Sequence, residues 1–434
     1  MDQKAIFSIG NSKFDFGLVR EIAEKEGSAA IKVLDRQDVQ PSHGRINFED
    51  LYARAKEAID ESDVEPDAII GDLDFPVTSL VSLLRREYDL PGASPEAVAK
   101  CEHKYWMRFV QSHAFPDDTP NYKAINPFAT GRGVSAPEFP FWLKPVKGHS
   151  SVLGFMVEDT SDLDKALHTC RQRIHLIGEP FNEFLNHVEV DPEVAEIDGN
   201  YAIAEGIISA SRQFTLEGYV WNGNTVIYGV VASIREGQHR SSFSSYQYPA
   251  DLPEETTKRA SEITARLIDQ IGYDNAPFNI EFFWDPDEDK LHILEINPRI
   301  SKSHAPLFRM VDGVSHHKVA IDLALGRQPE MPRGEGENKV AAKYMLRSHE
   351  ADGIVADIPD KDQIEKLAKI LPDINVNILV EKGVKLSELF YQDSYSYELA
   401  DIFLGGDGQQ MLEDEYNRCI DSLTFLIKPI PATS

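Results

Sequence analysis

The chain has 434 residues, of which 42% are hydrophobic, and its 44 Lys and Arg stand against 72 Asp and Glu, for a formal net charge of −28. So acidic a composition argues against nucleic-acid binding, which relies on Lys and Arg to neutralise phosphates, and against anionic membrane surfaces. The length predicts two to three domains with ordinary globular cores.

The three cysteines, Cys101, Cys170 and Cys419, are far apart in the sequence. They form neither a disulfide framework nor a zinc-binding spacing, which fits a reducing compartment. No apolar signal core follows Met1, and no apolar stretch is long enough to span a bilayer. We therefore expect a cytoplasmic protein without a membrane partner.

The first 95 residues alternate between strand and helix patterns. Strands are expected at 4–10, 29–34 and 67–71, and helices at 15–27, 48–59 and 77–88. This alternation predicts a parallel sheet with crossover helices. Gly10-Asn11 ends the first strand, but the run G-x-G-x-x-G is absent, so dinucleotide binding is not predicted.

Two lysines and a Gly/Ser loop follow. A helix is expected over 94–113, capped at Ser94 and carrying Lys104. An apolar strand over 139–145 ends at Lys144, a lysine that is costly to bury without a partner such as a phosphate. The loop between Gly148 and Gly154 includes Ser150 and Ser151, and its backbone N–H groups could close over phosphates. An ordinary surface hairpin explains the loop as well.

The next elements lead to a second hairpin and a polar loop. We expect a helix over 161–172 capped by Ser161, a strand over 201–208, a hairpin over 214–220 and 224–234, and a helix over 256–271. Asn222-Gly223 is a strong signal for the hairpin turn. The polar loop 235–243 contains Arg235 and Arg240, which suit an anionic substrate, although a solvated loop is an equal explanation.

A further hairpin carries the main candidate site. Two apolar runs, 278–283 and 291–299, flank an acidic turn. Because side chains alternate along a strand, Glu295 and Asn297 point the same way, and Glu281 on the partner strand can lie beside them. Three oxygen-bearing side chains suit Mg²⁺, and Arg299 offers a fork of donors for phosphate. On pattern alone, a solvated strand face is an equal explanation.

Residues 328–434 show no catalytic pattern. Residues 328–340 are rich in Pro, Gly and Glu and predict a linker or an exposed loop. Strands are expected at 339–347, 376–384 and 394–405, and helices at 364–371 and 409–425.

Glu281 and the run Leu294-Glu295-Ile296-Asn297-Pro298-Arg299 resemble the metal-binding strands of the ATP-grasp superfamily, in the branch with biotin carboxylase, carbamoyl-phosphate synthetase and L-amino acid ligases. The resemblance implies an α/β and α+β fold in three parts. These are a Rossmann-like pre-ATP-grasp domain over 1–95, an ATP-grasp domain over 96–330 with its lid at about 135–210, and a small α+β domain over 331–434.

The resemblance also implies a strand over 181–185 and roles for individual residues. Glu281, Glu295 and Asn297 would hold Mg²⁺, with Mn²⁺ as an alternative ion, and Arg299 would stabilise an acyl-phosphate. Lys104, Lys144, Gly148, Ser150 and Ser151 would bind the phosphates of ATP. The backbone of Glu205 and Ile207 would face adenine, and Gln213 stands where the family has a ribose-binding Glu. His103 replaces the usual Asp before Lys104. Candidate substrate contacts are Ser301, Lys302, His304, Arg235 and Arg240.

The function implied is an ATP-dependent carboxylate–amine ligase that forms an amide through an acyl-phosphate and releases ADP and phosphate. Its partners would be a small carboxylate and an amine, with an amino acid as the leading class. A homodimer is expected on the resemblance alone. Two alternatives stay open: a bicarbonate-activating carboxylase, and a non-catalytic ATP-binding protein of the same fold.

Overall fold

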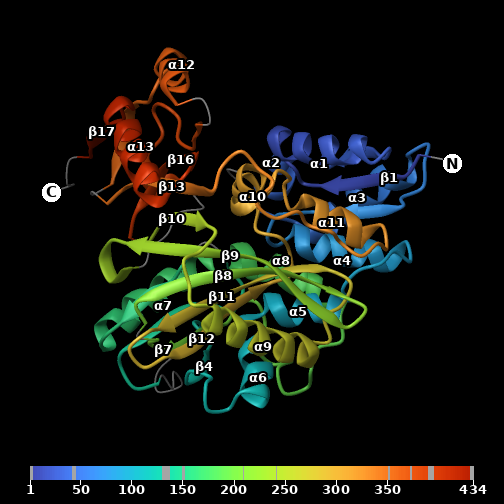
Figure 1. Ribbon diagram of the computed structural model, residues 1–434. Coiled ribbons are helices and arrows are strands. Elements are labelled where there is room, and N and C mark those ends of the chain that lie inside the picture. The colour runs from blue at the N-terminus through green and yellow to red at the C-terminus, as the bar shows by residue number, and fades with distance from the viewer. Residues whose placement is uncertain are drawn as a thin grey trace.

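The computed structural model describes residues 3–41, 45–129, 137–148, 152–208, 210–240, 242–349, 352–371, 374–389 and 395–430. The N-terminal part, in blue, and the C-terminal part, in orange and red, both lie on the upper side of the green and yellow strands of the central sheet in the view of Figure 1. Among the described helices, none has the length and apolar character needed to cross a membrane.

The N-terminal part is a small parallel sheet in the strand order β2-β1-β3. Its strands are β1 (Ala5–Ile9), β2 (Ala29–Val33) and β3 (Ala68–Ile70), and its helices are α1 (Lys13–Lys25), α2 (Arg36–Val39), α3 (Phe48–Asp60) and α4 (Val77–Glu87). Both β2 and β3 pair with β1 in the parallel sense, and every residue of β1 is buried. The predicted parallel sheet is therefore confirmed.

The helix expected over 94–113 is two helices, α5 (Pro95–Glu102) and α6 (Lys104–Ala114). His103 breaks the helix because its backbone is extended, with φ −90° and ψ 95°. Its buried ring accepts a hydrogen bond at Nδ1 from the backbone N–H of Trp106 at 3.1 Å. The other ring nitrogen lies 2.7 Å from the carbonyl of Ile197, which can only accept. His103 thus acts as the N-cap of α6 and places Lys104 at its first position.

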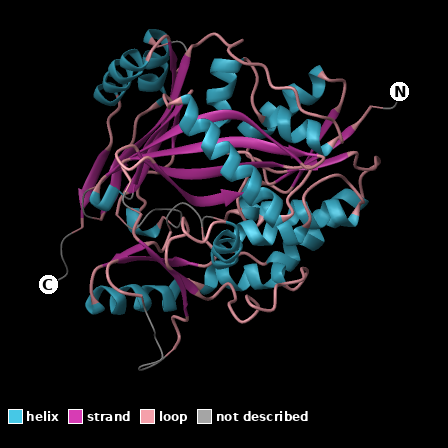
Figure 2. Cartoon of the chain, turned by 60° about the horizontal axis from the view of Figure 1, so that its bottom comes forward, coloured by secondary structure: helices cyan, strands magenta, loops and turns pink. Residues whose placement is uncertain are grey.

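A four-stranded antiparallel sheet follows, in the order β4-β7-β5-β6. It contains β4 (Tyr122–Ile125), β5 (Phe141–Pro145), β6 (Phe155–Val157) and β7 (Ala202–Gly206), with α7 (Thr160–Arg173) and α8 (His175–Leu185) between β6 and β7. In Figure 2 this small sheet lies below the large sheet, with a helix along its outer side.

Two predictions in this region are wrong. The strand expected over 181–185 is the end of α8, since Ile177, Phe181 and Phe184 recur at helical spacing and are buried on one face. A short apolar run in the sequence fits a buried strand and a buried helix segment equally well. The helix α7 is capped by Asp159 and not by Ser161, because the Asp159 carboxylate accepts from the N–H of Asp162 at 3.0 Å.

The central sheet has eight strands in the order β12-β11-β8-β9-β10-β13-β16-β15. The first five in this order are β12 (Lys290–Asn297), β11 (Pro277–Asp285), β8 (Arg212–Trp221), β9 (Asn224–Glu236) and β10 (Ser242–Tyr248), and α9 (Glu254–Ile271) follows β10 in the chain. Both predicted hairpins are confirmed, with Asn222 and Gly223 at φ 48° and 76° in the first turn. The loop expected over 235–243 is shorter than predicted, since β9 and β10 extend into it on either side of η2 (Gln238–Arg240).

The last three strands of the central sheet come from the C-terminal part: β13 (Val340–Ser348), β16 (Tyr397–Gly406) and β15 (Asn375–Ile378). Antiparallel pairing of β13 with β10 makes the sheet continuous across the predicted linker. The other elements of this part are β14 (Gly353–Asp357), α12 (Lys361–Ile370), η4 (Leu386–Glu388), α13 (Gln409–Ser422) and β17 (Leu426–Pro429).

The segment between β12 and β13 returns to the N-terminal part. It contains η3 (Lys302–His304), α10 (Ala305–Asp312) and α11 (His317–Ala324). Ile321 and Ala324 of α11 are buried against Ile6 of β1 and Val19 of α1, and Figure 1 shows α11 beside the blue helices and strands. The segment after Arg299 therefore links the central sheet to the N-terminal part, through α11, and then to the C-terminal part, through β13.

Candidate active site

One large cavity, of about 2020 Å³, lies between the small sheet, the central sheet and the N-terminal part. Every predicted site residue in the described part of the chain lines it. Ser150 and Ser151 lie outside the described residues. Residues separated by almost 200 positions in the sequence therefore share one cavity.

The predicted metal ligands lie together on the hairpin of β11 and β12. Glu281 pairs directly with Glu295, and Asn279 pairs with Asn297 in the same ladder. A bulge next to Glu281 shifts the register beyond this point. The Asn297 amide donates to Oδ1 of Asn279 at 3.0 Å, which leaves its own carbonyl oxygen available as a ligand.

The two carboxylates have opposite electrostatic surroundings. Burial, together with the neighbouring charge of Glu295, raises the pKa of Glu281 to about 7. Burial would also raise the pKa of Glu295, but Lys104 and Lys144 outweigh it and lower that pKa to about 2. Two carboxylates that face each other in a buried site favour a bound cation between them.

The described side chains contain no group of three His, Cys, Asp or Glu residues with metal-binding geometry. The hairpin offers two carboxylates and one amide instead. This set fits Mg²⁺, which is usually held by one or two protein carboxylates and completes its coordination with water and substrate phosphates.

Lys104 and Lys144 approach the same carboxylates from two other elements. The ammonium of Lys104 lies 2.9 Å from Oε2 of Glu295 and 2.9 Å from the carbonyl oxygen of Gly148. The ammonium of Lys144 on β5 lies 2.6 Å from Oε2 of Glu205 on β7. Burial lowers the pKa of Lys144, and Glu205 opposes this shift. Both ammonium groups therefore lie within the cavity next to the hairpin of β11 and β12, which carries the predicted metal ligands and is named the metal hairpin.

Arg108, which the sequence analysis did not select, connects the two sheets. Its buried guanidinium donates from Nε to Glu205 at 2.8 Å, and from Nη1 and Nη2 to the carbonyls of Ile293 and Leu294 at 3.1 and 2.8 Å. Leu294 is the residue at the bulge before Glu295. Arg108 therefore holds two carbonyls of the strand that carries Glu295, together with the carboxylate that contacts Lys144.

The carboxylate of Glu205 forms ion pairs with Arg108 and Lys144. From the sequence, only the backbone of Glu205 was expected to have a role. Burial would raise the pKa of Glu205, but Arg108 and Lys144 lower it to about 2. Ile207 follows the end of β7, and its side chain is 37% exposed on the cavity wall.

Gln213 on β8 lies beside the metal hairpin. Its amide nitrogen donates to Oε2 of Glu281 at 2.7 Å, and its amide oxygen accepts from Nε of Arg235 at 2.6 Å. The guanidinium of Arg235 stacks 3.7 Å from the ring centre of Phe243. Arg240 is exposed at the cavity rim, where it donates to the carbonyl of Ser211 at 3.4 Å. Gln213, predicted to contact ribose, therefore orients the carboxylate of Glu281, a predicted metal ligand.

Arg299 contacts the N-terminal part. Its Nε and Nη2 both donate to Oδ1 of Asp74, at 2.9 and 2.6 Å. Burial would lower the pKa of Arg299, but Asp74 raises it. Asp74 lies in the connection between β3 and α4, so the N-terminal part contributes a side chain to the site. Sequence reasoning missed Asp74 because an acid in a loop carries no distinctive pattern.

The three residues predicted after Arg299 face different partners. Lys302 lies 3.1 Å from the carboxylate of Asp15 in α1. The buried His304 lies with Nδ1 2.7 Å from Oε1 of Glu217 on β8, and the backbone N–H of Ser301 lies 3.4 Å from the other carboxylate oxygen. Burial raises the pKa of Glu217 to about 7 and lowers that of His304 to about 3.

Comparison with known proteins agrees with this geometry. Residues 137–305 match the family model described as an ATP-grasp domain. The chain thus carries an ATP-grasp domain, and the superfamily identified from the hairpin motif is confirmed. A curated relative, the uncharacterized protein y4rH of Sinorhizobium fredii, is 24% identical over 361 residues, which are 80% of this chain and 66% of that protein. The match thus spans slightly less than two thirds of the relative.

Solved structures share the fold over nearly the whole chain. L-amino acid ligase from Bacillus licheniformis aligns with a TM-score of 0.70 at 17% identity, covering 98% of this chain and 99% of that one. Carboxyaminoimidazole ribonucleotide synthase from Aspergillus clavatus, complexed with ATP, aligns with a TM-score of 0.65 at 13% identity, covering 97% and 98%. The ATP-grasp fold is therefore shared over 97–98% of the chain.

Proposed function

We propose that this protein is an ATP-dependent carboxylate–amine ligase that forms an amide bond and releases ADP and phosphate. The observation that carries the proposal is the pairing of Glu281 with Glu295 in one cavity with Lys104, Lys144 and Arg299. Two carboxylates, two ammonium groups and a guanidinium provide both a cation site and positive charge for a transferring phosphoryl group.

In the first step, a carboxylate oxygen of the substrate attacks the γ-phosphorus of ATP. The bond from that phosphorus to the bridging oxygen breaks, and ADP leaves with the electron pair. Lys104 and Lys144 neutralise phosphate oxygens, and Arg299 stabilises the charge that develops on the transferred group. Because the nucleophile belongs to the substrate, the protein needs only to position the reactants and screen their charge.

In the second step, the amine attacks the carbonyl carbon of the acyl-phosphate. The bond from carbon to the phosphate oxygen breaks, inorganic phosphate leaves, and the nitrogen loses a proton. Water has to be kept from the mixed anhydride, which it would otherwise hydrolyse before the amine attacks.

The site residues divide by position in the cavity. Glu281, Glu295 and Asn297 would hold Mg²⁺ or Mn²⁺, which supplies charge neutralisation of the nucleotide phosphates when bound. The backbone after β7 at Ile207, the amide of Gln213 and the turn at Gly148 would contact the nucleotide. Lys302, His304, Arg235, Arg240 and Ser301 line the rest of the cavity and would contact the carboxylate and amine substrates.

An assay of ADP release tests the proposal. Mg-ATP is supplied with pools of amino acids and small carboxylates, and Glu295→Ala is assayed in parallel. ADP release that depends on a pool and is lost in the variant supports a ligase. Absence of ATP binding by the wild-type protein would refute the proposal, and ADP release with bicarbonate alone would favour the carboxylase.

A further inference from the structure

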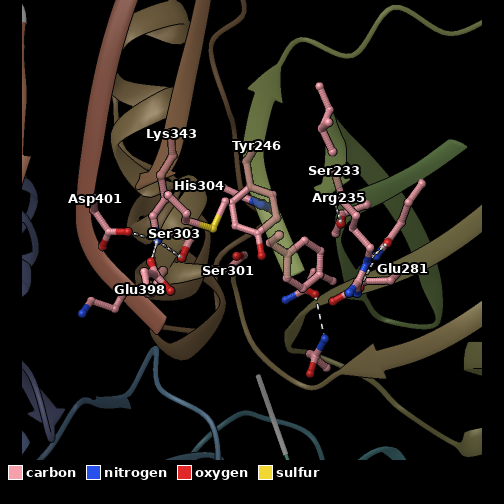
Figure 3. Close-up of a pocket in the computed structure, with 18 of the residues that line it drawn as sticks. Ser233, Arg235, Tyr246, Glu281, Ser301, Ser303, His304, Lys343, Glu398 and Asp401 are labelled. Atoms are coloured by element: carbon pink, nitrogen blue, oxygen red, sulfur yellow. Dashed lines mark hydrogen bonds and ion pairs between the residues drawn. The ribbon is translucent and has the colours of Figure 1, made fainter. Parts of the chain in front are cut away.

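The C-terminal part forms one wall of the cavity with charged residues that the proposed function has not used. Lys343 and Arg347 on β13 and Glu398 and Asp401 on β16 line the cavity together with Ser303 of η3. In Figure 3, Lys343, Glu398, Asp401 and Ser303 gather on one side of Tyr246, and Arg235 and Glu281 lie on the other side. This wall therefore belongs to the same cavity as the metal hairpin but lies away from it.

The charges on this wall form a connected network. The ammonium of Lys343 lies 2.8 Å from Oδ1 of Asp401, 4.0 Å from Oε1 of Glu398, and 3.3 Å from the hydroxyl of Ser303. Nη2 of Arg347 lies 2.8 Å from Oε2 of Glu398. The two acidic and two basic side chains thus have no net formal charge together, and groups of both signs line the cavity.

A buried nitrogen next to this network lacks a partner. His304 is 2% exposed, and its Nδ1 is occupied by Glu217. Its Nε2 has no hydrogen-bond partner among the described residues. The ring lies edge-on to Tyr246, with centres 4.8 Å apart, and the neighbouring Ser303 contacts Lys343. A buried polar atom without a partner is costly, and a ligand in the cavity would satisfy it.

A purely structural role for the network, as a joint between β13 and β16, would account for the ion pairs. It would not account for His304, which lines the cavity and whose buried Nε2 has no hydrogen-bond partner among the described residues. Nor does a joint require four charged side chains on the cavity side of the sheet, where desolvation makes them costly.

We propose that this wall, formed by Lys343, Arg347, Glu398, Asp401 and Nε2 of His304, is the subsite for the amine substrate, and that it selects an acceptor carrying an ammonium and a carboxylate close together. This inference rests on the proposed ligase function. The ammonium of such an acceptor complements Glu398 and Asp401, and its carboxylate complements Lys343 and Arg347. A neutral wall with adjacent opposite charges matches a zwitterion better than a simple cation or anion.

Competition between two acceptors tests this assignment. Mg-ATP and a mixture of the twenty standard L-amino acids are supplied together with hydroxylamine, which is small and largely uncharged near neutral pH. Hydroxamate reports acyl-phosphate captured by hydroxylamine, and dipeptide, measured by mass spectrometry, reports capture by a zwitterionic acceptor. The ratio of hydroxamate to dipeptide is compared among the wild type, Asp401→Asn, Glu398→Gln and the exposed control Asp421→Asn on α13.

Loss of one charged contact to the ammonium raises the ratio by about tenfold or more in Asp401→Asn and Glu398→Gln, and Asp421→Asn keeps the wild-type ratio. An unchanged ratio in both site variants overturns the subsite. If the wild type forms neither hydroxamate nor dipeptide, the ligase proposal itself is overturned. Failure of the subsite and failure of the ligase function therefore give different results. Melting temperatures identify a variant that fails to fold. If one of the two site variants does so, the product ratio of the other tests the subsite.

Discussion

Arg299, two residues after the end of β12, donates two hydrogen bonds to a single oxygen of Asp74, a residue of the N-terminal part 225 positions earlier. The guanidinium is thus held from the side of the N-terminal sheet, and its remaining donor Nη1 reaches the carbonyl of Ile300 at 3.1 Å. The N-terminal part therefore contributes directly to the orientation of the arginine expected to face the transferring phosphoryl group.

Replacing Asp74 by Asn should weaken ligation more than nucleotide binding. The amide removes the charged partner of Arg299 and keeps its size, so the guanidinium is less firmly oriented. We expect kcat to fall by roughly 10- to 100-fold, as expected when a catalytic group is misplaced by about an ångström, with KM for ATP changed much less. Steady-state ADP release at varied ATP measures both constants.

The control for this variant is Asp63→Asn, an exposed acid in the same part of the chain. It should retain wild-type kcat. Equal losses in the two variants, or a loss confined to KM for ATP in Asp74→Asn, would contradict the positioning of Arg299 by Asp74.

Glu205 should make stability depend on acid pH. Its folded pKa of about 2 lies below its ordinary value of 4.5. The carboxylate therefore contributes stability that is complete above pH 4.5 and is lost as the pH falls toward 2. In Glu205→Gln, Arg108 becomes a buried charge without its carboxylate, so the free energy of unfolding at neutral pH should drop by about 3–5 kcal/mol.

Urea unfolding at a series of pH values from neutral down to about 3 measures this effect. The variant should be less stable at neutral pH and should lose less stability on acidification than the wild type. Parallel pH curves for the two proteins would mean that Glu205 is not paired in solution as it is in this structure.

Removal of divalent ions should abolish turnover without unfolding the protein. Glu281, Glu295 and Asn297 lie on a hairpin whose strand β11 pairs with β8 from Pro277 to Trp284, so the proposed metal site is not needed for folding. EDTA should stop ADP release, added Mg²⁺ or Mn²⁺ should restore it, and the melting temperature in the absence of ATP should shift little. Full activity in EDTA would contradict the metal assignment.

Two glycines provide a matched pair for stability. A Cβ on Gly178 of α8 would lie 2.4 Å from the carbonyl oxygen of Gly199, a backbone atom that cannot move aside easily. Gly178→Ala should therefore cost about 1–3 kcal/mol. A Cβ on Gly17 of α1 meets nothing within 4 Å, so Gly17→Ala should be neutral or stabilise by about 0.5–1 kcal/mol. Chemical denaturation of both variants checks this contrast, and a reversed order would contradict the packing of α8.

Local patterns predicted much of the fold. The parallel sheet, the two hairpins and the helix before the metal hairpin follow from alternation, turn residues and helical spacing, which are properties of short segments. The pairing of Glu281 with Glu295 was accessible for the same reason, since a hairpin fixes its own register. The break at His103 was missed because an extended residue within a helical pattern leaves no compositional signal.

Long-range contacts were not accessible to this reasoning. Asp74, Arg108 and Glu217 contact partners 87 to 225 residues away in the sequence, and no periodicity relates such positions. The same holds for Lys343, Glu398 and Asp401. Strands β13 and β16 extend the central sheet into the cavity, whereas the sequence predicted only a separate small C-terminal domain.

Transfer of an isotope from the carboxylate to phosphate tests the central claim most directly. The protein is incubated with Mg-ATP and the pooled amino acids labelled with ¹⁸O in their carboxylates, and the released phosphate is analysed by mass spectrometry. Because a carboxylate oxygen attacks the γ-phosphorus and remains on it when the amine displaces phosphate, one ¹⁸O should appear in each phosphate released with a product. Unlabelled phosphate accompanying amide product would contradict an acyl-phosphate ligase.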